Sequence, residues 1–205
     1  MPDTATADLS VEKSIRTRRS IRRYTDEPVS VETVRHLVEL AGLAPSGSNL
    51  QPWRVVAVMG HDKKQELMAV ANNQKQVGGA AAVFVIYSDM ADATAHAAEV
   101  VHPGDAARRD QRAQGIRDHF AGVGEEKAAH WGEKMCFIFA GFLLLACQAA
   151  GYATSPMQGF DAQGVKELLG LPESATVPVI IAMGRPAEEG YTHHRHPVER
   201  ILRIV

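Results

Sequence analysis

The longest apolar run in the chain is MCFIFAGFLLLAC, from Met135 to Cys147. Hydrophobic side chains fill nearly every position, so the run predicts a helix from Glu133 to Ala150 that is apolar almost all round. Such a helix lies in the middle of a core or of a subunit interface. The 13 residues are too few to cross a bilayer, which needs about 20. The rest of the chain is therefore expected to pack around this helix.

The composition indicates one globular domain. The chain has 205 residues, of which 45% are hydrophobic and 22% charged. A pI near 6.5 argues against a nucleic-acid partner, because no strong basic field gathers phosphates. Met1 to Leu9 lacks an apolar core and so is no secretory signal. Cys136 and Cys147 are expected as buried small hydrophobes, which fits a cytoplasmic protein without a membrane partner.

Strands are expected both before and after the long helix in the sequence. Arg54 to Met59 and Thr176 to Met183 are apolar segments of strand length, and Ala80 to Tyr87 is a continuous apolar run of a buried strand. Pro178 favours an early or edge position because it has no N–H to donate.

Helices are expected from capping residues and apolar spacing. Ser10 caps a first helix with Val11 and Ile15 on its inner face, and Ser30 caps a second. Further helices are expected over Lys63 to Val70 and from Asp161 to Gly170.

Residues 88–130 are predicted to form an excursion that covers a site or a partner subunit, with a helix near 106–120. The segment is too polar for core and too long for a simple connection. Its four histidines do not fall at ligand spacing, and no metal site is expected there. These histidines are His96, His102, His119 and His130.

Arginines concentrate in the segment from Arg16 to Tyr24, where five occur in eight residues around Ser20. The planar guanidinium group suits phosphate and carboxylate, so the segment predicts a phosphate-binding loop. The alternative is a solvated basic helix face.

Two stiff polar loops accompany the arginines. Ala44 to Trp53 holds two prolines with small polar residues, and Thr154 to Asp161 holds Pro156 and Gly159. Their backbones suit the close approach of a large flat partner. No G-x-G-x-x-G motif, phosphate-binding lysine loop or nucleophile–base pair is present, so an enzyme of this sequence would depend on a bound cofactor.

These motifs, in this order, resemble the FMN-dependent nitroreductase family. The resemblance rests on Arg18 to Arg22, Ala44 to Trp53, Pro156 to Phe160 and Arg195, arranged around an apolar core helix. It implies an α+β fold with a central, mainly antiparallel sheet between helices. It also implies an intertwined homodimer with FMN at the subunit interface.

The resemblance also implies roles for particular residues. Arg18, Arg19, Ser20 and Arg22 would hold the phosphate, ribityl chain and pyrimidine edge of FMN, and Arg195 would close on the phosphate. Further cofactor contacts from the same subunit would come from Asn73 and from Pro156, Met157, Gln158 and Gly159. The second subunit would contribute Pro45, Ser46, Gly47 and Asn49. Phe120 or Trp131 would wall the substrate pocket or serve only in packing.

The implied activity is a two-step cycle in which NADH or NADPH reduces the flavin and an electron-poor acceptor, such as a nitroaromatic or quinone, then takes the hydride. Alternatives on the same fold are reductive dehalogenation, enone reduction and breakdown of the flavin, and a third class is a non-catalytic flavin-binding dimer. Two positions depart from many family members. Gln158 stands in place of Glu, and His193 in place of a Lys.

Overall fold

A four-stranded antiparallel sheet forms the centre of the computed structural model, which describes residues 10–205. The strands lie in the order β1-β2-β4-β3, so β2 and β4 are central and β1 and β3 are the edges. The strands are β1 (Trp53–Val58), β2 (Ala82–Ser88), β3 (Ala153–Met157) and β4 (Thr176–Gly184).

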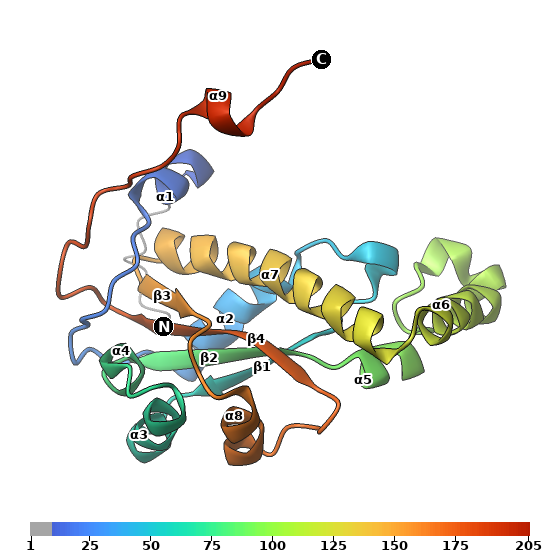
Figure 1. Cartoon of the computed structure of the whole chain (residues 1–205), viewed down its shortest axis with the longest axis horizontal. Helices are drawn as coiled ribbons and strands as arrows, with labels where there is room; N and C mark the ends of the chain where they lie inside the picture. The colour runs from blue at the N-terminus through green and yellow to red at the C-terminus, as the bar shows by residue number, and fades with distance from the viewer. Residues whose placement is uncertain (1–9) are drawn as a thin grey trace.

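Helices cover both faces of this sheet, and the expected α+β architecture is confirmed (Figure 1). Successive residues of β2 face opposite sides, so Phe84 and Ile86 pack beneath one helical layer while Val83 and Val85 pack beneath the other. The first layer contains α2 (Val31–Gly42) and α7 (Glu125–Ala149), and the second contains α3 (His61–Val70), α4 (Lys75–Gly78) and α8 (Ala162–Leu169).

The capping residues expected from the sequence are confirmed. Ser10 accepts a hydrogen bond from the N–H of Lys13 at 3.2 Å, and Ser30 accepts one from Thr33 at 3.1 Å. Asp161 caps α8, which ends at Gly170 in the left-handed conformation.

The excursion between β2 and α7 is largely helical and projects from one end of the sheet (Figure 1). It packs on a small apolar cluster in which Ala93, Ala97 and Ala113 contact Leu50 of the loop before β1. The excursion contains α5 (Met90–Ala95), η2 (Pro103–Arg108) and α6 (Arg109–Val123). The remaining elements are α1 (Val11–Thr17), η1 (Gly47–Asn49) and α9 (Val198–Ile201).

The long helix α7 differs from its prediction at its start and in its burial. It begins at Glu125 rather than Glu133, because buried Ala128 and Gly132 already pack against the excursion and the end of β2. One face packs on the sheet, whereas the opposite face leaves Phe137 and Phe142 exposed. By length and composition α7 could cross a membrane, but one such helix is weak evidence for a membrane span, because core helices pass the same test. The inner face of α7 packs against the sheet.

The predicted loop from Thr154 to Asp161 was wrong in its first half, because Ala153 to Met157 pairs with β4 as an edge strand, whereas residues 158–161 do form a loop. Pro156 is tolerated there since an edge strand has one unpaired side. Pro178 does lie early in its strand, but β4 is central. Ile86 of β2 pairs with Val179 and Ser88 pairs with Thr176, so the pairing is irregular between them. Pro178 lies in this irregular stretch, where its missing N–H is accommodated.

The expected inner face of α1 was also wrong. Val11 and Ile15 are exposed, and Ser14 is the buried residue of the helix. A seven-residue helix has only one narrow face, and here that face rests on α7, where Gln148 donates to the hydroxyl of Thr17.

Candidate functional site

The arginine segment leaves α1 and runs beside the edge strand β3. Ser20 forms a bridge with Thr154, and the N–H of Ile21 donates to the carbonyl of Thr154 at 3.1 Å. Arg18 and Arg19 are therefore held at the β3 edge of the sheet.

Tyr24 anchors the far end of this segment. Its hydroxyl donates to the carbonyl of Ile21 at 2.7 Å and lies 3.2 Å from that of Ala182. Burial raises the pKa of the Tyr24 phenol, so the hydroxyl stays protonated and keeps its role as donor. The ring packs directly over Gly184 at the end of β4, where a side chain would collide with it.

Three arginines meet at this edge. Burial, followed by the charges of Arg195 and Arg19, lowers the pKa of Arg18. Nη1 of Arg18 is buried without a hydrogen-bond partner among the described residues. The two charged groups that shift this pKa are both cations, so an anion bound here would relieve their repulsion and satisfy the free donor.

His193 fastens the C-terminal segment to the same arginines. Its Nε2 lies 2.7 Å from the carbonyl oxygen of Arg18, and its Nδ1 lies 3.4 Å from Nη1 of Arg19. A carbonyl can only accept, so Nε2 carries the proton in this arrangement, and Nδ1 is left to accept from the guanidinium group of Arg19. The segment that carries Arg195 is thereby fixed beside Arg18.

Arg22 lies differently from Arg18 and Arg19. Its side chain is exposed, and its N–H donates to the carboxylate of Glu188 at 2.8 Å. The same carboxylate pairs with Arg23 at 2.8 Å. The structure thus places Arg22 at the rim of the arginine cluster.

The segment after β3, which contains Gly159, is hydrogen-bonded to the turn from Asn72 to Gln74. The side-chain amides of Asn72 and Gln74 both donate to the carbonyl of Gly159 at 2.8 Å. Gln158, Gly159 and the predicted Asn73 are all exposed, whereas Met157 is buried and Pro156 half-buried. The sequence analysis missed Asn72 and Gln74. The Asn-Asn pair was the available signal, since asparagine favours the left-handed turn seen here.

The loop from Pro45 to Asn49 lies at the other edge of the sheet, because it leads into β1. Ser46 accepts a hydrogen bond from the N–H of Gln51 at 3.0 Å, and Asn49 donates to the carbonyl of Val100 at 3.1 Å. The two edge strands are about 14 Å apart across three inter-strand spacings. One protomer therefore does not bring this loop to the arginine cluster.

Backbone strain is concentrated in two of the predicted cofactor segments. Every non-glycine residue with positive φ between residues 10 and 205 lies in one of them. Such conformations cost free energy and persist where the surroundings enforce them, which is common at binding sites. The residues are Ser48, Asn49 and Gln51 in the first segment and Asn72 and Asn73 in the second.

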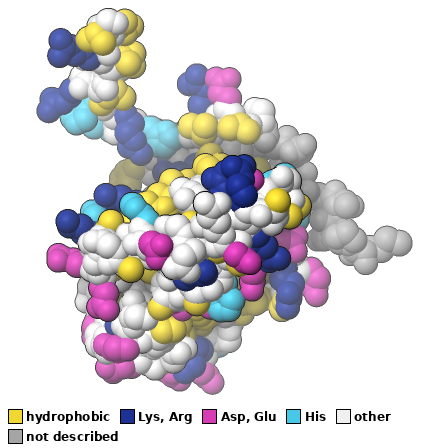
Figure 2. All heavy atoms as spheres, turned by 90° about the vertical axis from the view of Figure 1, so that its right-hand side faces the viewer, with side chains coloured by type: hydrophobic (Ala, Val, Ile, Leu, Met, Phe, Trp, Pro, Cys, Tyr) yellow, Lys and Arg dark blue, Asp and Glu magenta, His cyan; other side chains and the backbone are white. Residues whose placement is uncertain are grey.

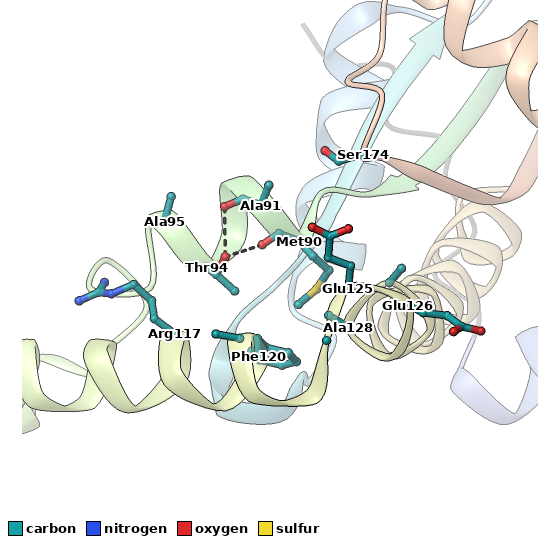
Figure 3. Close-up of a pocket in the computed structure, with 13 residues that line it drawn as sticks. Met90, Ala91, Thr94, Ala95, Arg117, Phe120, Glu125, Glu126, Ala128 and Ser174 are labelled. Atoms are coloured by element: carbon teal, nitrogen blue, oxygen red, sulfur yellow. Dashed lines mark hydrogen bonds between the residues drawn. The ribbon is translucent and has the colours of Figure 1, made fainter.

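Phe120 and Trp131 lie together, with ring centroids 4.9 Å apart. Trp131 packs against Gly47, where an added Cβ would lie 3.0 Å from the indole. Phe120 lines a cavity of about 890 Å³ between α5, α6 and the start of α7 (Figure 3). In this view Met90 points toward Phe120, while Arg117 points away from it. The two aromatic side chains therefore connect the excursion to the loop before β1.

Comparison with known proteins agrees with this geometry. The family model described as the nitroreductase family matches residues 15–185. An NADH dehydrogenase of Thermus thermophilus is 45% identical over 186 residues, which cover 90% of this chain and 91% of that protein. The chain belongs to the nitroreductase family.

Two further relatives support this membership. YdgI of Bacillus subtilis, a candidate NAD(P)H nitroreductase by its name, is 32% identical and is covered over 92% of its length by 90% of this chain. A crystal structure from Exiguobacterium sibiricum, in complex with FMN, has a TM-score of 0.88 at 25% identity. The alignment covers 96% of this chain and 98% of that one.

The contact between Tyr24 and Gly184 gives a first prediction. In Gly184→Ala the new Cβ would lie 2.9 Å from Cβ and Cγ of Tyr24, atoms next to the backbone that cannot rotate away. We expect the free energy of unfolding in urea to fall by about 1–3 kcal/mol. Gly60→Ala is the matched control, because nothing lies within 4 Å of its added Cβ. Equal stability of the two variants would contradict the tight packing of Tyr24.

Proposed function

We propose that this nitroreductase-family protein binds FMN with its phosphate at Arg18, Arg19 and Arg195. The observation that carries the proposal is the buried, unpaired Nη1 of Arg18 beside two further cations. A phosphate supplies both the negative charge and the acceptor oxygens that this arrangement lacks. The FMN-bound relative supports the choice of ligand.

The remaining residues of this edge suit the other parts of the cofactor. The exposed backbone of Gln158 and Gly159 can donate to a flavin ring edge, and the exposed amide of Asn73 can reach the same ring. Ser20 and Arg22, at the start and rim of the cluster, suit the ribityl chain and the pyrimidine edge. Bound FMN would accept hydride from a nicotinamide donor and pass it to an electron-poor acceptor in a second, separate step.

A second copy of the chain would complete the site. The loop from Pro45 to Asn49 and the arginine cluster lie at opposite edges of one sheet. In a two-fold dimer each protomer could contribute one of the two halves.

Exposed apolar surface supports this homodimer. Phe137, Ile138 and Phe142 of α7 are exposed, and Val205 at the chain end is fully exposed. Figure 2 shows hydrophobic side chains on the C-terminal arm and on the body beneath it. Apolar patches of this kind mark protein interfaces.

For the activity we propose reduction of nitroaromatics, quinones or similar acceptors by NADH or NADPH in the cytoplasm. The names of the Thermus and Bacillus relatives support a nicotinamide donor. Phe120 and Trp131 are proposed as an aromatic wall for the acceptor, because Trp131 packs against Gly47 in the cofactor loop.

The visible spectrum of the purified protein tests this function. We expect the absorbance of bound flavin, and we expect it to bleach on anaerobic addition of NADH or NADPH. Addition of a quinone or nitroaromatic should then restore the absorbance of the oxidised flavin and give the reduced acceptor. Flavin that neither dinucleotide bleaches would favour a non-catalytic flavin-binding dimer, and a chain that cannot be reconstituted with FMN would overturn the proposal.

The phosphate site gives a second test. Arg18→Ala removes a charge-assisted hydrogen bond and should weaken FMN binding about ten- to a hundredfold. Riboflavin, which lacks the phosphate, should lose little affinity, so the preference for FMN over riboflavin should shrink in fluorescence titrations. Arg16→Ala is the control, since Arg16 pairs with Glu12 on the exposed face of α1. Unchanged FMN preference in Arg18→Ala would leave the arginines as a solvated basic face. Arg22→Ala, assayed in parallel, measures the contribution of the rim residue.

The dimer is tested on the exposed face of α7. Phe142→Glu places a charge where the interface is proposed, and should shift the protein toward a monomer of 22.2 kDa in light scattering. Bound FMN should be lost with the dimer. Val31→Glu is the control, because an exposed acid in the first turn of a helix is well tolerated. A Phe142→Glu protein that stays dimeric would place the interface elsewhere.

A further inference from the structure

A second cavity, of about 950 Å³, lies between the loop before β1 and one face of α6. Ser48 and Asn49 form one wall, and these residues belong to the loop proposed to contact FMN in the second protomer. The opposite wall is Arg108, at the end of η2, followed at helical spacing along α6 by Gln111, Arg112, Gly115, Ile116 and His119. Gly115 leaves the centre of that wall without a side chain, since nothing lies within 4 Å of an added Cβ.

The charge inside this cavity is positive. Asp105 is the only acid among the described residues that line it. Its two oxygens are already engaged, one by Nη2 of Arg108 at 2.7 Å and the other by Nε of Arg112 at 2.6 Å. These two guanidinium groups hold the pKa of the Asp105 carboxyl below its usual range, so it stays ionised. One carboxylate neutralises one of two arginines, and a positive charge remains.

Free hydrogen-bond donors face the same space. Arg112 pairs with Asp105 through Nε, which leaves its two terminal nitrogens as donors. Nδ1 of His102 accepts from the N–H of Gly104 at 3.0 Å, so the proton of the neutral ring is on Nε2. Val100 and Ile116 add an apolar surface beside these donors.

We propose that this cavity binds the carboxylate or phosphate of a molecule that reacts at the flavin, with Arg112 as the residue that selects for it. The inference rests on the proposed function, because that function brings Asn49 to the cofactor. Asn49 also donates to Val100 in the cavity wall, so the cofactor loop and the cavity are mechanically joined. The anion belongs either to an acidic electron acceptor or to the nicotinamide dinucleotide.

Arg112→Gln tests the proposal in the FMN-loaded protein, with Arg109→Gln as the matched control. Arg109 is on the same helix but is not among the residues that line either cavity, and its Nε donates to the carbonyl of Ala98 at 2.8 Å. Calorimetric titration compares 4-nitrobenzoate with 4-nitrobenzamide, which differ in charge and not in the nitroaryl ring. Stopped-flow reduction compares NADH with NADPH.

We expect Arg112→Gln to lose about tenfold in affinity for 4-nitrobenzoate or in the rate of reduction by a dinucleotide. Binding of 4-nitrobenzamide and the behaviour of the control variant should be unchanged. Loss of 4-nitrobenzoate binding assigns the cavity to the acceptor. Slower reduction by both dinucleotides assigns it to their diphosphate, and slower reduction by NADPH alone assigns it to the 2′-phosphate. Arg112→Lys should recover part of the loss, because it restores the charge without the planar fork.

Equal effects on 4-nitrobenzoate and 4-nitrobenzamide, with unchanged reduction by both dinucleotides, would overturn the inference. The same loss in Arg109→Gln would also overturn it, since the effect would then be general to α6. If the wild-type flavin is not bleached by either dinucleotide, the proposed function fails. The calorimetric comparison would still decide whether the cavity selects an anion.

Discussion

The rest of the fold depends on burial of both faces of the β2–β4 pair. Side chains of β2 and β4 point alternately into two apolar clusters, each covered by helices. A sheet buried on both sides fixes its register, because a slip of one residue would exchange the two clusters. The functional segments are therefore left to the edges of the sheet and to the connections around it.

Placing the functional segments at opposite edges has a chemical consequence. The β3 edge holds three arginines and a buried donor that has no partner within residues 10–205, a costly arrangement in the absence of an anion. The β1 edge holds a loop with three strained residues and little charge. One edge thus has the charged donors and the other has the uncharged loop. The exposed apolar face of α7 offers a surface on which two copies could associate and bring the two edges together.

The excursion borders two cavities, and the loop proposed to contact the cofactor lines one of them. Its two cavities lie on different faces of α6 and differ in character. Methionine, alanine and phenylalanine line much of one, whereas arginine, histidine and amide side chains make up half of the residues that line the other. The excursion rests on a small apolar cluster that also includes Leu50 of the loop before β1, so the excursion and that loop are packed together.

The sequence by itself determined the features that depend on neighbouring residues. Ser10, Ser30 and Asp161 cap helices because each side chain bonds to an N–H two or three residues ahead. The apolar runs of β2 and β4 likewise identify buried strands. Only the tertiary structure decided that Ala153 to Met157 forms an edge strand, that Val11 and Ile15 are exposed, and that Arg195 lies beside Arg18. These features depend on strand pairing and packing between distant segments, for which no local pattern exists.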